Sequence, residues 1–180
     1  MPRPYPASCL RLSLAALVLL LISAVPALRS TDLPEVPDQY GQPVALDDSS
    51  HTVQVAIVVT AKRLRRIKPW EKALIKAFPD LKVVRVADIP RTSPTTYEKV
   101  AVKLRKRLPK DLSVGIDLEG DWAKRVNLDT SVPNLLLFDV NGRLAAVHSG
   151  MYKASRFEPV RSDLESLLAQ AGNTIDAPRE

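Results

Sequence analysis

One side chain in this 180-residue sequence can do thiol chemistry, Cys9, and it lies ahead of a long apolar run. Residues 12–22 read LSLAALVLLLI, with two arginines before them, and residues 23–27 are the small residues SAVPA. This layout is typical of a secretory signal peptide over residues 1–27. The alternative is an uncleaved membrane anchor, although the run is short for a helix that spans a bilayer.

Cleavage of this segment would leave a mature chain without any thiol. Such a chain could not form a disulfide within itself, so its stability would rest on core burial. Roughly 150 residues would remain, which is enough for one domain with a proper core. The whole chain carries a formal net charge of +6. We expect a basic protein exported to a bacterial periplasm or secreted, with membrane contact only if the segment stays uncleaved.

The densest cluster of charge is basic, and its functional interpretation is a surface that binds an anion or a partner. The alternative interpretation is a solvated loop, because charge runs are often only soluble surface. The cluster has no interleaved aromatic residues, so we expect no nucleic acid. The predicted partner is an envelope protein or an anionic surface. The cluster consists of Lys62, Arg63, Arg65, Arg66 and Lys68.

A second group of candidate residues is acidic. Asp117, Glu119 and Asp121 could hold a divalent cation, but they lack the full ligand set of a calcium loop, and Asp121 is suited to cap a short helix. The two histidines, His51 and His148, show no metal-ligand spacing. The sequence has no Gly-x-Ser-x-Gly elbow and no glycine-rich phosphate loop. We therefore predict no metal and no cofactor.

The elements that must position these residues follow from hydrophobic periodicity. Residues 28–50, rich in Pro, Asp and Ser, predict a lead-in outside the core, with a turn that could join two short strands. Residues 53–60 read VQVAIVVT, which predicts a central strand covered on both faces. A basic loop over residues 61–68 follows this strand and precedes the first helix.

Strands and helices then alternate along the chain. The pattern predicts a domain over residues 51–172 of the α/β class, with a mixed sheet and helices on both faces. Asn141-Gly142 predicts a hairpin turn, and Gly172 is expected to close the last helix before a disordered tail at 173–180. The further predicted strands are 81–87, 112–118, 134–140 and 144–148, and the predicted helices are 69–78, 97–108, 122–126 and 156–171.

This order resembles the thioredoxin-like superfamily, and one stretch carries most of the resemblance. Residues 131–143 read SVPNLLLFDVNGR, like the family's proline step before an apolar strand, a turn and another strand. The resemblance implies a cis peptide bond at Pro133, which would present the backbone of Val132 to an extended partner strand. Residues 33–46 also look like the opening of the peroxiredoxin-related and cytochrome-maturation branches.

The chain departs from the family where the family's chemistry resides. After the first core strand such proteins carry a Cys-x-x-Cys pair or a single reactive cysteine at a helix N-terminus, which lowers the thiol pKa. Residues 61–70 here read AKRLRRIKPW and contain no cysteine. Disulfide reduction and peroxide removal are therefore not carried over, and the resemblance implies only the fold and the surface around Pro133.

Three functional hypotheses follow. The first is a redox-inactive, thioredoxin-like protein that binds a partner through the basic cluster together with Val132 and Pro133. The second is a thiol-free enzyme that would use Asp88, Asp117 or Glu119, which requires a carboxylate that faces the basic cluster across a pocket. The third is an accessory member of a thiol-disulfide or antioxidant system, in which a partner supplies the thiols.

Overall fold

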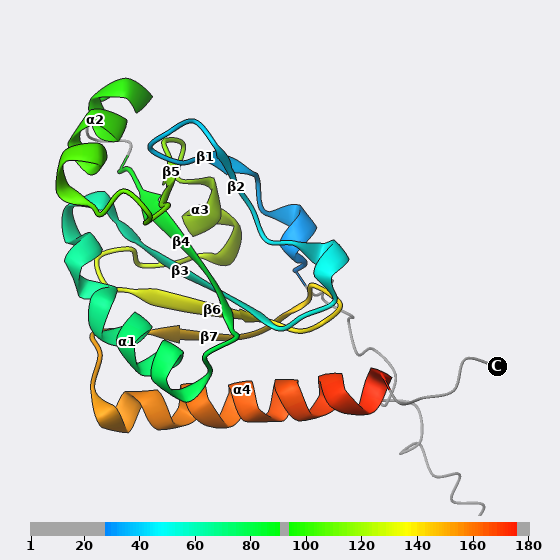
Figure 1. Cartoon of the computed structure of the whole chain (residues 1–180). Helices are drawn as coiled ribbons and strands as arrows, with labels where there is room; N and C mark the ends of the chain where they lie inside the picture. The colour runs from blue at the N-terminus through cyan, green and yellow to red at the C-terminus, as the bar shows by residue number, and fades with distance from the viewer. Residues whose placement is uncertain (1–27, 91–93, 176–180) are drawn as a thin grey trace, which may run out of the picture.

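The computed structural model describes residues 28–90 and 94–175 of the chain. Its centre is a five-stranded sheet in the order β5-β4-β3-β6-β7 (Figure 1). The strands β3, β4 and β5 are parallel, and β6 and β7 continue the sheet in antiparallel fashion. The bounds are β3 Gln54–Thr60, β4 Lys82–Asp88, β5 Gly115–Asp117, β6 Asn134–Phe138 and β7 Leu144–Ser149.

Alternate side chains of β3 pack on opposite faces of the sheet, because successive residues of a strand point to opposite sides. Val55, Ile57 and Val59 belong to the core on the side of α1 (Lys68–Ala77) and α4 (Ala154–Ile175). Ala56 and Val58 belong to a second core on the side of α3 (Asp121–Val126). All seven residues of β3 are buried, so the prediction of a central strand is confirmed.

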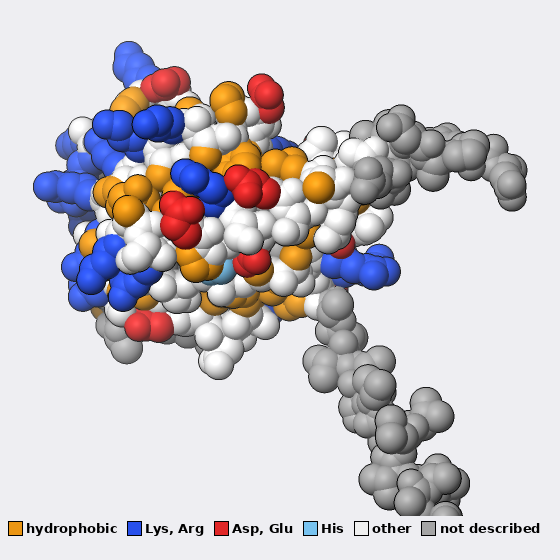
Figure 2. Space-filling view, turned by 90° about the horizontal axis from the view of Figure 1, so that it is seen from below, with side chains coloured by type: hydrophobic (Ala, Val, Ile, Leu, Met, Phe, Trp, Pro, Cys, Tyr) orange, Lys and Arg blue, Asp and Glu red, His pale blue; other side chains and the backbone are white. Residues whose placement is uncertain are grey.

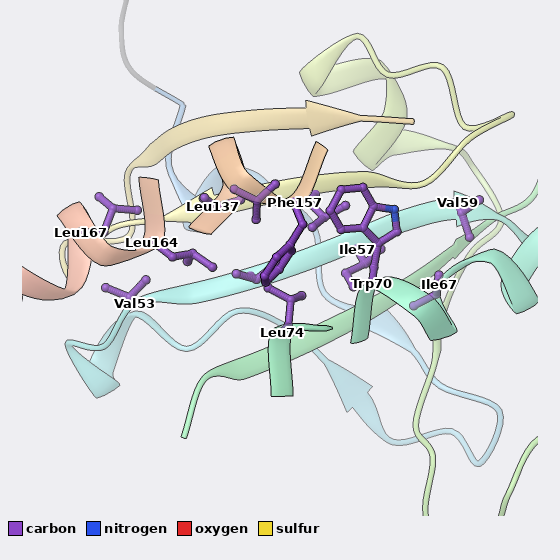
Figure 3. Close-up of a cluster of buried hydrophobic side chains, with 13 residues drawn as sticks. Val53, Ile57, Val59, Ile67, Trp70, Leu74, Leu137, Phe157, Leu164 and Leu167 are labelled. Carbon is purple, nitrogen blue, oxygen red and sulfur yellow. The ribbon is translucent and has the colours of Figure 1, made fainter. Parts of the chain in front are cut away.

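The first core is built around aromatic side chains of α1 and α4. Trp70 is 1% exposed and its indole N–H donates to the Gly150 carbonyl at 3.1 Å. The Trp70 ring lies 6.5 Å from that of Phe157 and 5.3 Å from that of Tyr152, centroid to centroid. Figure 3 shows Trp70 and Phe157 between the ribbon of β3 and the two helices. This packing anchors the N-terminal part of α1.

The lead-in is part of the core, so its prediction as a segment outside the core is wrong. Leu33 and Val36 are 7% and 6% exposed and pack in the second core. The helix on that face, α3, has six residues, so the lead-in covers the sheet that α3 leaves open. Its turn joins β1 (Val36–Pro37) to β2 (Pro43–Val44), as predicted, and the short 3-10 helices η1 (Ser30–Asp32) and η2 (Asp48–Ser50) flank this pair.

Other element bounds differ from prediction for identifiable reasons. β5 has three residues instead of seven, because Leu112 and Val114 make backbone hydrogen bonds to the buried Gln39 side chain of the lead-in. α4 continues past Gly172 to Ile175, so the prediction that Gly172 closes this helix is wrong. A glycine costs about 1 kcal/mol relative to alanine in a helix, too little to end a well-packed one. The predicted tail from residue 176 onwards lies outside the described residues.

Candidate binding groove

The basic cluster folds as a helical segment, not as the predicted loop. The chain leaves β3 at Thr60 and forms the 3-10 helix η3 over Ala61–Arg66, and α1 follows at once. Leu64 and Ile67 are three residues apart, so a 3-10 helix places them on one side, toward the core. The cations therefore point outward: Lys62, Arg63, Arg65 and Lys68 are exposed, and Arg66 is half-buried.

A groove of about 660 Å³ lies between this segment and the C-terminal end of α2 (Tyr97–Arg107). Arg85 of β4 lines it from below, because it alternates with Val84 and Val86 and so points toward the α1 face of the sheet. Seven cationic side chains and one carboxylate, Glu71, line this groove. The cations are Lys62, Arg63, Arg65, Arg66, Lys68, Arg85 and Arg107.

The lead-in holds α2 in the position that forms this wall. The Tyr97 hydroxyl donates to the Asp38 carbonyl at 2.6 Å, and the Arg105 guanidinium donates to the Gln39 carbonyl at 2.7 Å. Gln39 is fully buried and its side-chain amide bonds the loop that precedes β5. Both ends of α2 are thus tied to the lead-in, and Gln39 ties the lead-in to the loop before β5.

Two of the predicted site residues have structural partners. The guanidinium groups of Arg63 and Arg66 both donate to the Ser131 carbonyl, Arg66 at 3.1 Å. Hydrogen bonds from Ser131, aided by the charge of Arg63, lower the pKa of Asp129. These arginines therefore tie η3 to the loop before β6.

The other cations of the cluster have no such partner. Within the described ranges, the side chains of Lys62, Arg65 and Lys68 form no hydrogen bond or ion pair, and neither does Arg107 on the facing wall. Figure 2 shows lysine and arginine side chains gathered at the end of the molecule where α1 and α2 lie in Figure 1. Four exposed and unpaired charges around one groove favour an anionic ligand.

The floor of the groove is electrically balanced. Arg85 and Glu71 form an ion pair, and their side chains are 20% and 13% exposed. A pair this poorly hydrated depends on both of its members, because either charge alone would be costly to bury. The attraction for an anion is therefore concentrated at the rim.

Val132 and Pro133 do not belong to this site. No peptide bond of the described residues is cis, so the prediction of a cis Pro133 is wrong. The trans form is the intrinsic preference of an X–Pro bond. Pro133 is buried and its carbonyl accepts from the Gly150 N–H at 2.9 Å, while the Val132 carbonyl accepts from the Asn134 side chain at 2.9 Å. Each of these two carbonyls thus accepts a hydrogen bond within the chain, and neither residue lines the groove.

Two of the three carboxylates considered for a thiol-free enzyme, Asp88 and Asp117, lie on the other face of the sheet, and the third, Glu119, is exposed in the loop between β5 and α3. Thr60, Asp88 and Asp117 are neighbours in register across three strands and follow Val58 and Val86 on the α3 face. We call these three residues the buried polar row. The Thr130 hydroxyl donates to Asp88 at 2.5 Å. None of the three lines the groove.

Asp117, not Asp121, caps α3. Its carboxylate accepts from the backbone N–H groups of Asp121 and Trp122 at 3.1 and 3.0 Å. Burial raises the pKa of Asp117, although these hydrogen bonds act in the opposite direction. In the part of the chain that the structure describes, no group of three or more His, Cys, Asp or Glu side chains could hold a metal ion.

Two cations of the groove lie outside the predicted basic cluster: Arg85 on β4 and Arg107 on α2. A second basic run, residues 103–110, contains Lys103 and Lys106, which lie on the exposed side of α2. Arg107, however, lies three residues after Leu104, so it is on the same side of the helix as Leu104 and lines the groove. That spacing is the signal that could have identified it.

Comparisons with known proteins bear on the fold. No protein-family model matches the sequence, and no curated protein matches it. Solved structures do match: the exposed lipoprotein thioredoxin Etrx1 of Streptococcus pneumoniae has 16% identity and a TM-score of 0.58, over 73% of this chain and 98% of that one. A putative thiol:disulfide interchange protein DsbE from Chlorobium tepidum has 18% identity and a TM-score of 0.57, over 79% and 96%. The N-terminal domain of PilB from Neisseria gonorrhoeae has 16% identity and a TM-score of 0.58, over 77% and 94%.

The described helices include none that is both long and apolar enough to cross a membrane. The predicted signal peptide at 1–27 lies outside the described residues. The strand order, the helices on both faces of the sheet and the structural neighbours agree, and they confirm the predicted fold class: this chain has a thioredoxin-like fold.

Proposed function

We propose that this protein acts by binding, and that the groove between η3, α1 and α2 is its contact surface. One observation carries the proposal: Lys62, Arg65, Lys68 and Arg107 surround the groove, are exposed and have no partner in the described parts of the chain. Charges without partners raise the local concentration of an oppositely charged ligand. The expected partner is an envelope protein with an acidic surface.

Thiol chemistry by the chain itself is not part of this proposal. The sequence contains one cysteine, Cys9, and residues 61–70, where the resemblance implies a reactive thiol, contain none. A thiol–disulfide exchange needs an attacking thiolate. Residues 1–27 read as an export signal, and one structural neighbour is an exposed lipoprotein, so we propose a periplasmic or secreted location.

An accessory role in a thiol-disulfide system is a second candidate. The observation that favours it is the fold similarity to a thiol:disulfide interchange protein. In such a role the partner supplies the thiols, and this chain supplies the groove. A thiol-free enzyme is not favoured, because Asp88 and Asp117 lie on the α3 face and Glu71, the carboxylate in the groove, is paired with Arg85.

The test is crosslinking in living cells that express the full, tagged chain, followed by identification of the proteins captured. A groove variant combines Lys62→Glu, Arg65→Glu and Lys68→Glu. Its matched control combines Lys99→Glu, Lys103→Glu and Lys106→Glu, which changes charge equally on the exposed side of α2, outside the groove. We expect a defined envelope protein that is lost in the groove variant and retained in the control.

The capture should fall by about a hundredfold in the groove variant, which corresponds to about 2.7 kcal/mol of binding free energy. A partner with a reactive cysteine pair would favour the accessory role. Equal capture by the groove variant and the control would contradict the proposed contact surface, and no captured protein in any sample would contradict protein binding itself.

A further inference from the structure

The groove has two chemically different walls. The η3 and α1 side presents the unpaired charges of Lys62, Arg65 and Lys68. The facing side is mainly apolar and partly accessible: Leu108 and Leu112 are half-buried and Pro109 is exposed, with Arg107 at its edge. A ligand that is only anionic would leave the apolar wall exposed to solvent. A ligand that is only apolar would leave the cations without a charged partner.

A membrane surface fits this arrangement poorly. A protein that lies on an anionic bilayer places apolar side chains into the headgroup region beside its cations. The large apolar side chains that are exposed in this molecule, such as Ile75, Met151 and Leu168, do not line the groove. The large apolar side chains near the cations, Leu108 and Leu112, are instead half-buried in the groove wall.

We propose that the groove recognises an extended acidic segment of a partner protein in which apolar side chains alternate with carboxylates. The carboxylates contact Lys62, Arg65 and Lys68, and an apolar side chain contacts Leu108 and Pro109 on the facing wall. This inference rests on the proposed function and names its partner class. Glu71 and Arg85 on the floor of the groove neutralise each other, so the net charge of the groove is the positive charge of its rim. This positive charge repels basic segments.

The experiment compares two labelled peptides of equal charge, one alternating Glu and Leu and the other alternating Glu and Ser. Binding is measured by fluorescence anisotropy with protein isolated from cells that express the full chain. A third arm uses vesicles of phosphatidylglycerol. We expect the Glu-Leu peptide to bind about tenfold more tightly, because one buried leucine side chain supplies that difference. Added salt should weaken both peptides, since the cations are exposed.

Amino-acid substitutions separate the contribution of the apolar wall from that of the cations. Leu108→Gln should remove the preference for the Glu-Leu peptide, and the exposed Pro109→Ser is the second variant in case Leu108→Gln does not fold. The control Leu168→Gln, on α4 and outside the groove, should keep the preference. The triple groove variant should lose both peptides.

Equal affinity for the two peptides would overturn this inference. If the triple groove variant then binds neither peptide, the proposed function still holds. Vesicle binding that the triple groove variant abolishes, without peptide binding, would overturn the inference in favour of a membrane surface. Peptide binding that is unchanged in the triple groove variant would overturn both proposals.

Discussion

The groove and the buried polar row lie at the same end of the parallel strands but on opposite faces of the sheet. Their charged groups differ in burial and in hydrogen-bond partners. In the row, Asp88 accepts from Thr130 and Asp117 accepts from two backbone N–H groups of α3. In the groove, Lys62 and Arg65 are exposed and, within the described residues, unpaired. The buried charges have internal partners and so stabilise the fold, whereas the exposed, unpaired charges around the groove are the basis of the proposed binding.

The largest effect on stability is expected from the row. Asp117→Ala removes the acceptor for both N–H groups at the start of α3, and loss of a cap of this kind costs about 2 kcal/mol. The free energy of unfolding, measured by urea denaturation, should fall by that amount. Asp121→Ala is the control and should change it little, since Asp121 is exposed to solvent in part and caps nothing. Equal losses in the two variants would contradict the role of Asp117.

A smaller difference in stability is expected between variants of two adjacent arginines in the basic cluster. Arg66→Ala should lower the free energy of unfolding by about 1 kcal/mol, because the Arg66 hydrogen bond to the Ser131 carbonyl is lost. Arg65→Ala should leave stability within about 0.5 kcal/mol, as is usual for exposed surface changes. If both variants lose the same stability, the division into structural and ligand-binding arginines is wrong.

Thr60 allows a change in the opposite direction. Its hydroxyl is buried and has no hydrogen-bond partner in the described part of the structure. Thr60→Val replaces this group with a methyl group of similar shape, so the free energy of unfolding should rise by about 1 kcal/mol. Thermal unfolding followed by circular dichroism measures this difference. A decrease would show that the hydroxyl is satisfied in solution.

The smallest effect is a dependence of stability on pH. Burial raises the pKa of Asp117 in the folded state. The stability associated with its protonated form is therefore present below the ordinary aspartate pKa and is lost as the pH rises through the raised value. Asp117→Asn cannot titrate, so the stability of the original chain relative to this variant should decline across that acidic window. A relative stability that rises with pH would contradict the direction of the shift.

Hydrophobic periodicity was sufficient to predict the fold class. The apolar run of β3 and the alternation of strands and helices along the chain correctly predict a sheet with helices on both faces. The burial of Leu33 and Val36 could not be predicted, because they lie in a segment of polar composition. Their burial depends on the short length of α3, which leaves part of the sheet for the lead-in to cover. Periodicity describes one element at a time and does not show which face remains uncovered.

The candidate site could be predicted only in part. The sequence locates the basic cluster, but it does not show that Arg63 and Arg66 have a hydrogen-bond partner while Lys62 has none. That partner is the Ser131 carbonyl, more than sixty residues away in the chain. Arg85 and Arg107 enter the groove from β4 and α2, and only the tertiary fold brings them together. The cis Pro133 is an inference from family resemblance alone, and in the structure this peptide bond is trans.

The attachment of the lead-in to the turn between β6 and β7 has a consequence for the order of folding. Ser30 bonds the Gly142 carbonyl across a sequence separation of 112 residues, and the Leu144 N–H bonds the Leu28 carbonyl. Contacts of such long range form late, because closing the loop between them costs entropy before they stabilise anything. We expect the first described residues of the lead-in to dock last, after the β6–β7 hairpin exists.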